Sequence, residues 1–234
     1  MKNHRAFAAA ATLAAFAALL ACTTTKQEKV KMTPEMQGFM GDAYPLLEPG
    51  KEGQVELRYI AQNIDWKKYK GTMLEPVQFW AGSDSKVPAD AQQMLSSYIY
   101  NSLKTNLEKV GVNLTDLPGP GVMRAQVALT DVTKATPVLR TVSVIVPQAR
   151  LLNQAQELLT GSYGFSGSAE VALKVTDSQT GQLLAAAIDR RGGGGSVEQA
   201  AVWQWGDATA AIDHWTELFA QKIVELRAKA KAAK

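Results

Sequence analysis

The feature that most constrains the fold is a pair of β-rich runs joined by a short turn. In residues 168–176 apolar and polar side chains alternate, with Glu170 and Lys174 on the polar side, which is the period of a half-buried strand. Residues 177–181 read DSQTG, a segment with the residue types of a turn. Residues 182–190 then return as a run that is apolar on both faces over most of its length, which predicts a central strand.

Two long amphipathic segments accompany this hairpin. Residues 88–110 and 207–230 each carry apolar side chains at three- and four-residue spacing, the pattern of a helix with one buried face. A further alternating strand is predicted at 122–132, and shorter extended segments at 55–60 and 72–80. The sequence therefore predicts an α+β fold: an antiparallel or mixed sheet of four to six strands with two long helices packed on one face.

The first 22 residues have the organisation of a bacterial lipoprotein signal peptide. Lys2 and Arg5 precede a run rich in alanine and leucine, which is shorter than the roughly 20 residues that span a bilayer. The sequence LLAC, which ends at Cys22, resembles a lipobox, in which the thiol accepts a diacylglycerol and the chain is cut before the cysteine. Cys22 is the only cysteine, so an intramolecular disulfide and a thiolate metal cluster are excluded.

This pattern predicts three parts. We expect a cleaved signal peptide at 1–21, a lipidated Cys22 with a flexible tether over 22–42, and a single α+β periplasmic domain over 43–232. Thr23, rather than aspartate, follows the cysteine, which resembles sorting to the outer membrane with the body facing the periplasm. The expected partners are the membrane, through the lipid on Cys22, and a periplasmic or outer-membrane protein. Three apolar residues indicate that the end of the tether docks on the body: Met36, Phe39 and Met40.

Charge and residue types argue against several functional classes. Residues 1–21 contain two cations and no acidic residue, so their removal lowers the net formal charge from +3 to +1. Such a body lacks the clustered basic face of a nucleic-acid-binding protein. Its one histidine, His214, is too little for a zinc site or a Ser-His-Asp set. The glycine run at 192–195 lacks the Gly-Lys-Ser/Thr of a phosphate-binding loop and is interpreted as a connector. We therefore expect no cofactor, no metal and no enzymatic activity.

The strongest polar candidate for a binding site is the sequence Asp189, Arg190, Arg191 at the end of the second run. Strand alternation sends the two arginines to opposite faces, so at most one is expected to reach the core, paired with a carboxylate. Two interpretations remain open: a structural ion pair, or an arginine at a cleft that binds an anionic or peptide partner. Trp203 and Trp205 would lie alongside, as an aromatic shelf or as a plug of the core.

An envelope hydrolase acting on glycan or peptide is the alternative class. Asp131 ends one predicted strand, and Asp177 and Asp189 lie at opposite ends of the hairpin. Two carboxylates about 5 to 9 Å apart would form a glycosidase pair, although strand-end aspartates are commonly turn formers. Convergence of two of these carboxylates in a deep cleft would favour the hydrolase, and separate, solvent-facing placement would exclude it.

Several segments together resemble the bacterial lipoproteins of the domain of unknown function 3313 family. These are DWKKYKG with EPVQFW, then GPGVMRAQVALTDV, then DSQTGQLLAAAIDRRGG, followed by a closing helix that bears tryptophan. The resemblance spans roughly residues 42–225. It implies an outer-membrane-anchored periplasmic lipoprotein and brings no established activity and no catalytic residues. Its most specific residues are Asp177, Thr180, Gly181, Ala185, Asp189 and Arg190, with 128–131 before them.

The predicted anchor has a direct test. The intact mass of the mature protein should correspond to a chain that starts at Cys22 and carries acyl groups. Replacement Cys22→Ser should release or misprocess the chain, because the acyl acceptor is gone. An unmodified thiol on a full-length soluble chain would contradict the prediction.

Overall fold

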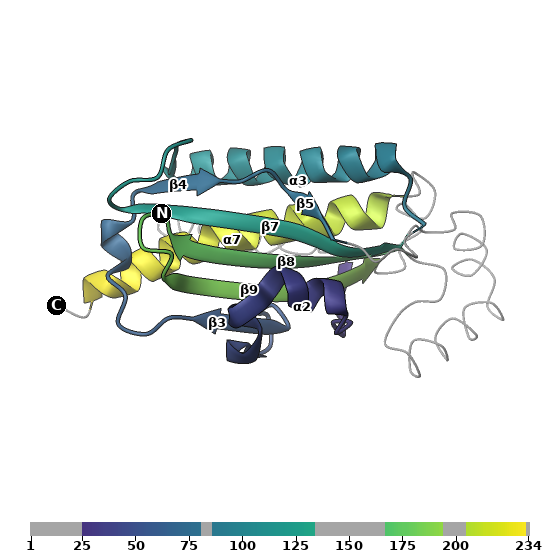
Figure 1. Ribbon diagram of the computed structural model, residues 1–234, viewed down its shortest axis with the longest axis horizontal. Helices are drawn as coiled ribbons and strands as arrows, with labels where there is room; N and C mark the ends of the chain where they lie inside the picture. The colour runs from purple at the N-terminus through teal and green to yellow at the C-terminus, as the bar shows by residue number, and fades with distance from the viewer. Residues whose placement is uncertain (1–24, 81–85, 134–166, 194–204, 233–234) are drawn as a thin grey trace, which may run out of the picture.

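The computed structural model describes residues 25–80, 86–133, 167–193 and 205–232 (Figure 1). Cys22, the predicted signal peptide and Trp203 lie outside the described residues. In chain order the elements are β1 (Thr25–Glu28), α2 (Pro34–Met40), the 3₁₀ helix η1 (Gly41–Leu46), β2 (Glu48–Pro49), β3 (Leu57–Ile60), the 3₁₀ helix η2 (Trp66–Lys68), β4 (Gly71–Leu74), β5 (Gln78–Phe79), α3 (Ala89–Lys109), β6 (Asn113–Leu114), β7 (Val122–Thr133), β8 (Ser168–Asp177), β9 (Leu183–Gly193) and α7 (Gly206–Ala232).

Nine strands of the described chain form one mixed sheet. Its order is β2-β3-β9-β8-β7-β4-β6, with β1 also paired to β9 and β5 to β7. The predicted hairpin is present as β8 and β9, which pair antiparallel from Thr176 opposite Leu183 to Ser168 opposite Gly192. Gly181 takes a φ of 73° in the turn, a conformation that favours glycine. As predicted, β9 is internal, because β3 and β8 flank it.

Helices cover both faces of this sheet. The long helices α3 and α7 pack on one face, where Leu95, Ile99 and Ile212 meet the inward side chains of β7 and β8. The short helix α2 lies on the opposite face, in front of β8 and β9 in Figure 1. Among the described residues, no helix combines the length and the apolar character that crossing a bilayer requires.

The structure corrects the predicted sheet and helices in number. The α+β class holds only roughly, because the described residues form a sheet of nine strands rather than four to six, and they contain three α-helices rather than two. The region 72–80 is not one strand, because Pro76 separates β4 from β5, and both run parallel to β7. Proline has no N–H for a ladder hydrogen bond, which is why the strand stops there.

Residues 25–42, which the sequence analysis placed in a flexible tether, are instead folded onto the body. β1 pairs with the end of β9, from Thr25 opposite Gly193 to Glu28 opposite Arg190. Thr33 caps α2 by accepting a hydrogen bond from the Met36 amide at 3.3 Å. The predicted docking of Met36, Phe39 and Met40 is confirmed, since all three are buried against β8 and β9.

Replacement of a methionine in α2 tests how firmly this segment is held. Met40 is only 1% exposed, so Met40→Ala should lower the free energy of unfolding by about 2–5 kcal/mol, because it leaves a cavity under α2. Denaturant unfolding would measure the loss. Met32 is 54% exposed, so the control Met32→Ala should change stability by less than about 0.5 kcal/mol. Equal, small effects of both changes would contradict the packing described.

Candidate functional site

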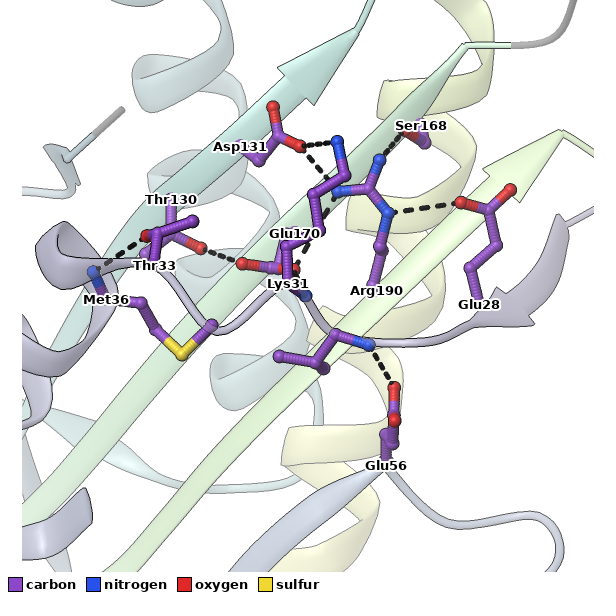
Figure 2. Close-up of polar contacts among 11 residues, drawn as sticks. Glu28, Lys31, Thr33, Met36, Glu56, Thr130, Asp131, Ser168, Glu170 and Arg190 are labelled. Atoms are coloured by element: carbon purple, nitrogen blue, oxygen red, sulfur yellow. Dashed lines mark hydrogen bonds and ion pairs between the residues drawn. The ribbon is translucent and has the colours of Figure 1, made fainter. Parts of the chain in front are cut away.

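Four charged residues form a row across four strands on the α2 face of the sheet. Asp131 on β7 lies opposite Glu170 on β8, Glu170 lies opposite Arg190 on β9, and Arg190 lies opposite Glu28 on β1. Residues directly opposite in neighbouring strands have their side chains on the same face. We call Asp131, Glu170, Arg190 and Glu28 the ionic row (Figure 2).

The Arg190 guanidinium is the centre of the ionic row. Its Nη1 donates to Asp131 Oδ2 at 2.6 Å and its Nε to Glu28 Oε2 at 3.1 Å. Its Nη2 donates to Ser168 Oγ at 2.5 Å, and Glu170 Oε2 lies 3.8 Å from Nη1. Arg190 is 5% exposed. Donors on every side of the guanidinium therefore meet an oxygen, which is what allows an arginine to be buried.

The ionic row contains three carboxylates and one guanidinium, and burial and the neighbouring cations shift the carboxyl pKa values in opposite directions. Burial raises the pKa of Glu28 and of Glu170 above the ordinary value, against the opposing effect of Arg190. Burial would also raise the pKa of Asp131, but the hydrogen bond from Lys31 and the charge of Arg190 outweigh it and hold that pKa below its ordinary value. Lys31 Nζ lies 2.8 Å from Asp131 Oδ2 and supplies a second cation.

Backbone groups of the N-terminal segment (residues 25–40) are bound by carboxylates of the body. The Lys31 amide donates to Glu170 Oε2 at 2.8 Å, and the Val30 amide donates to Glu56 Oε2 at 2.5 Å (Figure 2). Thr130 Oγ1 donates to the other Glu170 oxygen at 2.8 Å. Glu170 thus joins the segment between β1 and α2 to the middle of the sheet, and the ionic row fastens the N-terminal segment in place.

A second polar cluster lies on the opposite face, under α7. Asp189 Oδ2 accepts from Arg191 Nε at 3.1 Å and from Trp215 Nε1 at 2.8 Å. Asp189 Oδ1 accepts from Gln27 Nε2 at 2.6 Å and from the Glu56 amide at 2.8 Å. Four donors occupy this carboxylate, which is 1% exposed. Asp189 therefore connects β9 to α7 and to the N-terminal segment.

The two arginines lie on opposite faces, as strand alternation predicts, but the expectation that at most one reaches a core is wrong. Arg190 and Arg191 are 5% and 9% exposed. α2 and β1 cover the face that carries Arg190, and Arg191 lies on the other face, beside Asp189 under α7. Both are paired with carboxylates. Trp205 is buried between the sheet and the long helices, in the position of a plug rather than a shelf.

Asp177 lies far from the other predicted site residues. It is opposite Met123, whereas Glu170 is opposite Asp131, and eight residues of strand span about 26 Å. The amides of Thr180 and Gln179 and the Tyr69 hydroxyl bind its carboxylate. The Thr180 amide, followed by Tyr69, lowers its pKa to about 2.

The carboxylates named for a hydrolase are therefore not brought together. Asp177 accepts hydrogen bonds from amides of the β8–β9 turn. Asp189 accepts four hydrogen bonds under α7, and Asp131 is paired with Arg190 and Lys31 on the other face of the sheet. Within the described ranges, no three His, Cys, Asp or Glu side chains are placed so that they could hold a metal ion.

A cavity of about 550 Å³ lies between α7 and the part of the sheet formed by β3, β8 and β9. Ala185 and Ala187 contribute to its floor, and both stay partly exposed although β9 is an internal strand. Its remaining walls are mostly apolar and come from α7, β8, β3 with the loop before it, and parts of α3 and β7. They include Val55, Arg58, Val171, Leu173, Val175, Trp215, Leu218, Phe219, Ile223 and Leu226.

The sequence analysis missed Glu28, Glu56 and the buried position of Glu170. Glu170 was assigned to the polar face of its strand, yet it is 0% exposed. A signal was present: alanines occupy this face at 128, 172 and 186. Such short side chains leave room for another element to pack on this face of the sheet. The predicted docking of Met36, Phe39 and Met40 supplies that element, α2.

Removal of the central cation tests the ionic row. Arg190→Met should lower the free energy of unfolding at neutral pH by about 3–5 kcal/mol, because three carboxylates would lose their buried partner. The control Arg124→Met affects a β7 arginine whose side chain is 41% exposed and pairs with Glu75, and should cost less than about 1 kcal/mol.

The pH dependence of the same variant is a second readout. Burial raises the pKa of Glu28 and of Glu170 in the folded state, and Arg190 opposes this rise. Removal of Arg190 therefore raises both pKa values further, so the variant gains more stability than the parent protein as the pH falls toward the ordinary glutamate value. The loss caused by Arg190→Met should therefore shrink on mild acidification, measured by denaturant unfolding between neutral and mildly acidic pH. A loss that is independent of pH would contradict this account.

Comparison with known proteins shows the family and leaves the activity open. No curated protein matches the chain in sequence. A PelC dodecamer structure from Paraburkholderia phytofirmans shares 11% identity over 70% of this chain and 97% of that chain, with a TM-score of 0.39. The protein XCC0632 from Xanthomonas campestris shares 8% over 75% and 94%, with a TM-score of 0.38. A putative neuraminyllactose-binding hemagglutinin homolog from Helicobacter pylori shares 10% over 80% and 95%, with a TM-score of 0.33.

These structural likenesses are too weak to support an argument about function. The family model, in contrast, covers residues 35–219, which is most of the chain and includes β7, β8, β9 and the ionic row from Asp131 to Arg190. The resemblance found in the sequence is thereby confirmed. The chain belongs to the family described as protein of unknown function (DUF3313).

Proposed function

We propose that this protein is a lipid-anchored module of the cell envelope that binds a ligand or partner without catalysis. The observation that carries the proposal is the cavity under α7. Its volume of about 550 Å³ falls in the range of small-molecule sites, roughly 300–1,000 Å³, and its mostly apolar walls are typical of such sites.

The chemistry around the cavity supports binding rather than reaction. Asp189 lines the cavity, and four donors hold its carboxylate in place. The other acidic residues that line the cavity are Glu52 and Glu225. Glu225 pairs with Lys222 at 2.7 Å on α7, and Glu52 is exposed in the loop before β3. These residues do not form a nucleophile with an adjacent base.

The proposed membrane anchor is the lipid on Cys22, and the position of β1 limits how far the folded body can lie from it. β1 begins at Thr25, three residues after Cys22, and three extended residues span about 10 Å. A lipid on Cys22 would therefore hold the folded body close to the membrane surface rather than on a long flexible tether. Outer-membrane attachment, a periplasmic location and a protein partner there remain parts of the proposal.

A photoreactive amino acid at the cavity tests the binding function in cells. Leu218 on α7 lines the cavity, whereas Val224 on the same helix does not and is 45% exposed. We expect a crosslinked product at Leu218, seen as added mass on the intact protein, and little or none at Val224. Equal yields at the two positions, or no product at either, would contradict the proposed binding function.

A further inference from the structure

We propose that the cavity under α7 takes a single-chain amphiphile, with the acyl chain along α7 and an anionic head group at Arg58. The inference rests on the proposed function, because it names the ligand of the same cavity. A fatty acid carboxylate and a lysophospholipid phosphate share this chemistry.

The polar groups that line the cavity beside Trp215 already have partners within the protein. Asp189 is occupied by four donors, as described above. Thr216 Oγ1 accepts from Asn106 Nδ2 at 3.0 Å and donates to the Asp213 carbonyl at 3.0 Å. A polar ligand group placed there would lose its hydration without gaining a hydrogen bond, which is costly. Asp189 and Thr216 therefore offer a ligand no polar partner, and the mostly apolar walls favour a hydrocarbon chain.

The cavity extends along the helix that forms its roof. Its lining residues follow α7 from Trp215 to Leu226, eleven residues that rise about 16 Å. On β8 they run from Val171 to Val175, about 13 Å of strand. The floor opposite is kept open by the small Ala187, which is partly exposed. A long apolar space of this kind fits an extended acyl chain.

Arg58 is the cation that gives the cavity its preference for an anionic head. Arg58 lies on β3, lines the cavity and is half-buried, and its Nη1 donates to Gln54 Oε1 at 2.6 Å. No carboxylate of the described residues forms an ion pair with it, in contrast to Arg190 and Arg191. Lys222, the other cation that lines the cavity, is paired with Glu225. The free donors of the Arg58 guanidinium can bind a carboxylate or phosphate.

Displacement of a fluorescent long-chain fatty acid from the purified full chain, in detergent-free buffer, tests the proposal. We expect saturable binding, and displacement by myristate at concentrations about tenfold lower than by myristyl alcohol, since only the carboxylate forms a charged hydrogen bond. Stronger displacement by a lysophospholipid would assign the head as a phosphate, and stronger displacement by myristate would assign it as a carboxylate.

Two variants with matched controls locate the chain and the head. Ala187→Leu fills the floor of the cavity and should weaken binding by about tenfold or more. Ala228→Leu makes the same change at an exposed position of α7 and should not. If Ala187→Leu fails to fold, Leu218→Trp narrows the cavity from the helix side. Arg58→Gln should abolish the preference for the carboxylate over the alcohol, whereas Lys51→Gln, at an exposed site in the loop before β3, should keep it.

The outcomes separate this inference from the proposed function. Lack of saturable fatty acid binding, unchanged affinity in both cavity-filling variants, or equal affinity for acid and alcohol would each overturn it. If the fatty acid does not bind and Leu218 still yields a crosslinked product in cells, the binding function stands and only the ligand class is wrong.

Discussion

The buried Arg190 guanidinium is the interaction on which the arrangement of the other elements depends. A buried arginine destabilises a fold unless its donors are matched by acceptors. Here the acceptors come from separate parts of the chain: Glu28 from β1, Asp131 from β7 and Ser168 from β8. Because Arg190 itself lies on β9, the same interaction aligns β7, β8 and β9 and fixes β1 of the N-terminal segment on them. The same geometry explains the glycine at position 192, since a Cβ there would overlap the Glu28 carboxylate.

The two faces of the sheet have different roles because charge is distributed unequally between them. On the α2 face, the ionic row and the alanines beneath α2 give a closely packed layer. On the other face, Asp189 ties β9 to Trp215 near one end of the cavity. Beyond that tie, Ala185 and Ala187 line the floor with short side chains. α7 is held again farther along the helix, where Arg227 Nη2 donates to the Tyr69 carbonyl at 2.6 Å. Between these two ties the small alanine side chains leave space under α7, and the cavity lies there.

The sequence predicted the elements better than the layers. Periodicity located the hairpin, α3 and α7, because each has a strong pattern within a short window. It could not show which face of β8 was covered, so Glu170 was assigned to solvent and residues 25–42 to a tether. Alternation tells which residues share a face; it does not tell what packs on that face. The short strands β2, β5 and β6, of two residues each, depend on their neighbours and carry no periodic signal of their own.

The candidate site was predicted in part for the same reason. Asp189, Arg190 and Arg191 were recognised as the unusual charges of the chain, and their alternation was correct. Of their partners, Asp131 was named from the sequence as a candidate site residue. Glu28 and Glu56 were not, because they are distant in sequence and meet the cluster only through the folding of the strands. The cavity gives no sequence signal, since alanines in a strand are common. Once Arg190 and Arg191 are neutralised within the fold, Arg58 is the cation of the cavity wall whose charge has no carboxylate partner among the described residues. The contrast between the neutralised arginines and Arg58 moves the functional question from the end of the hairpin to β3.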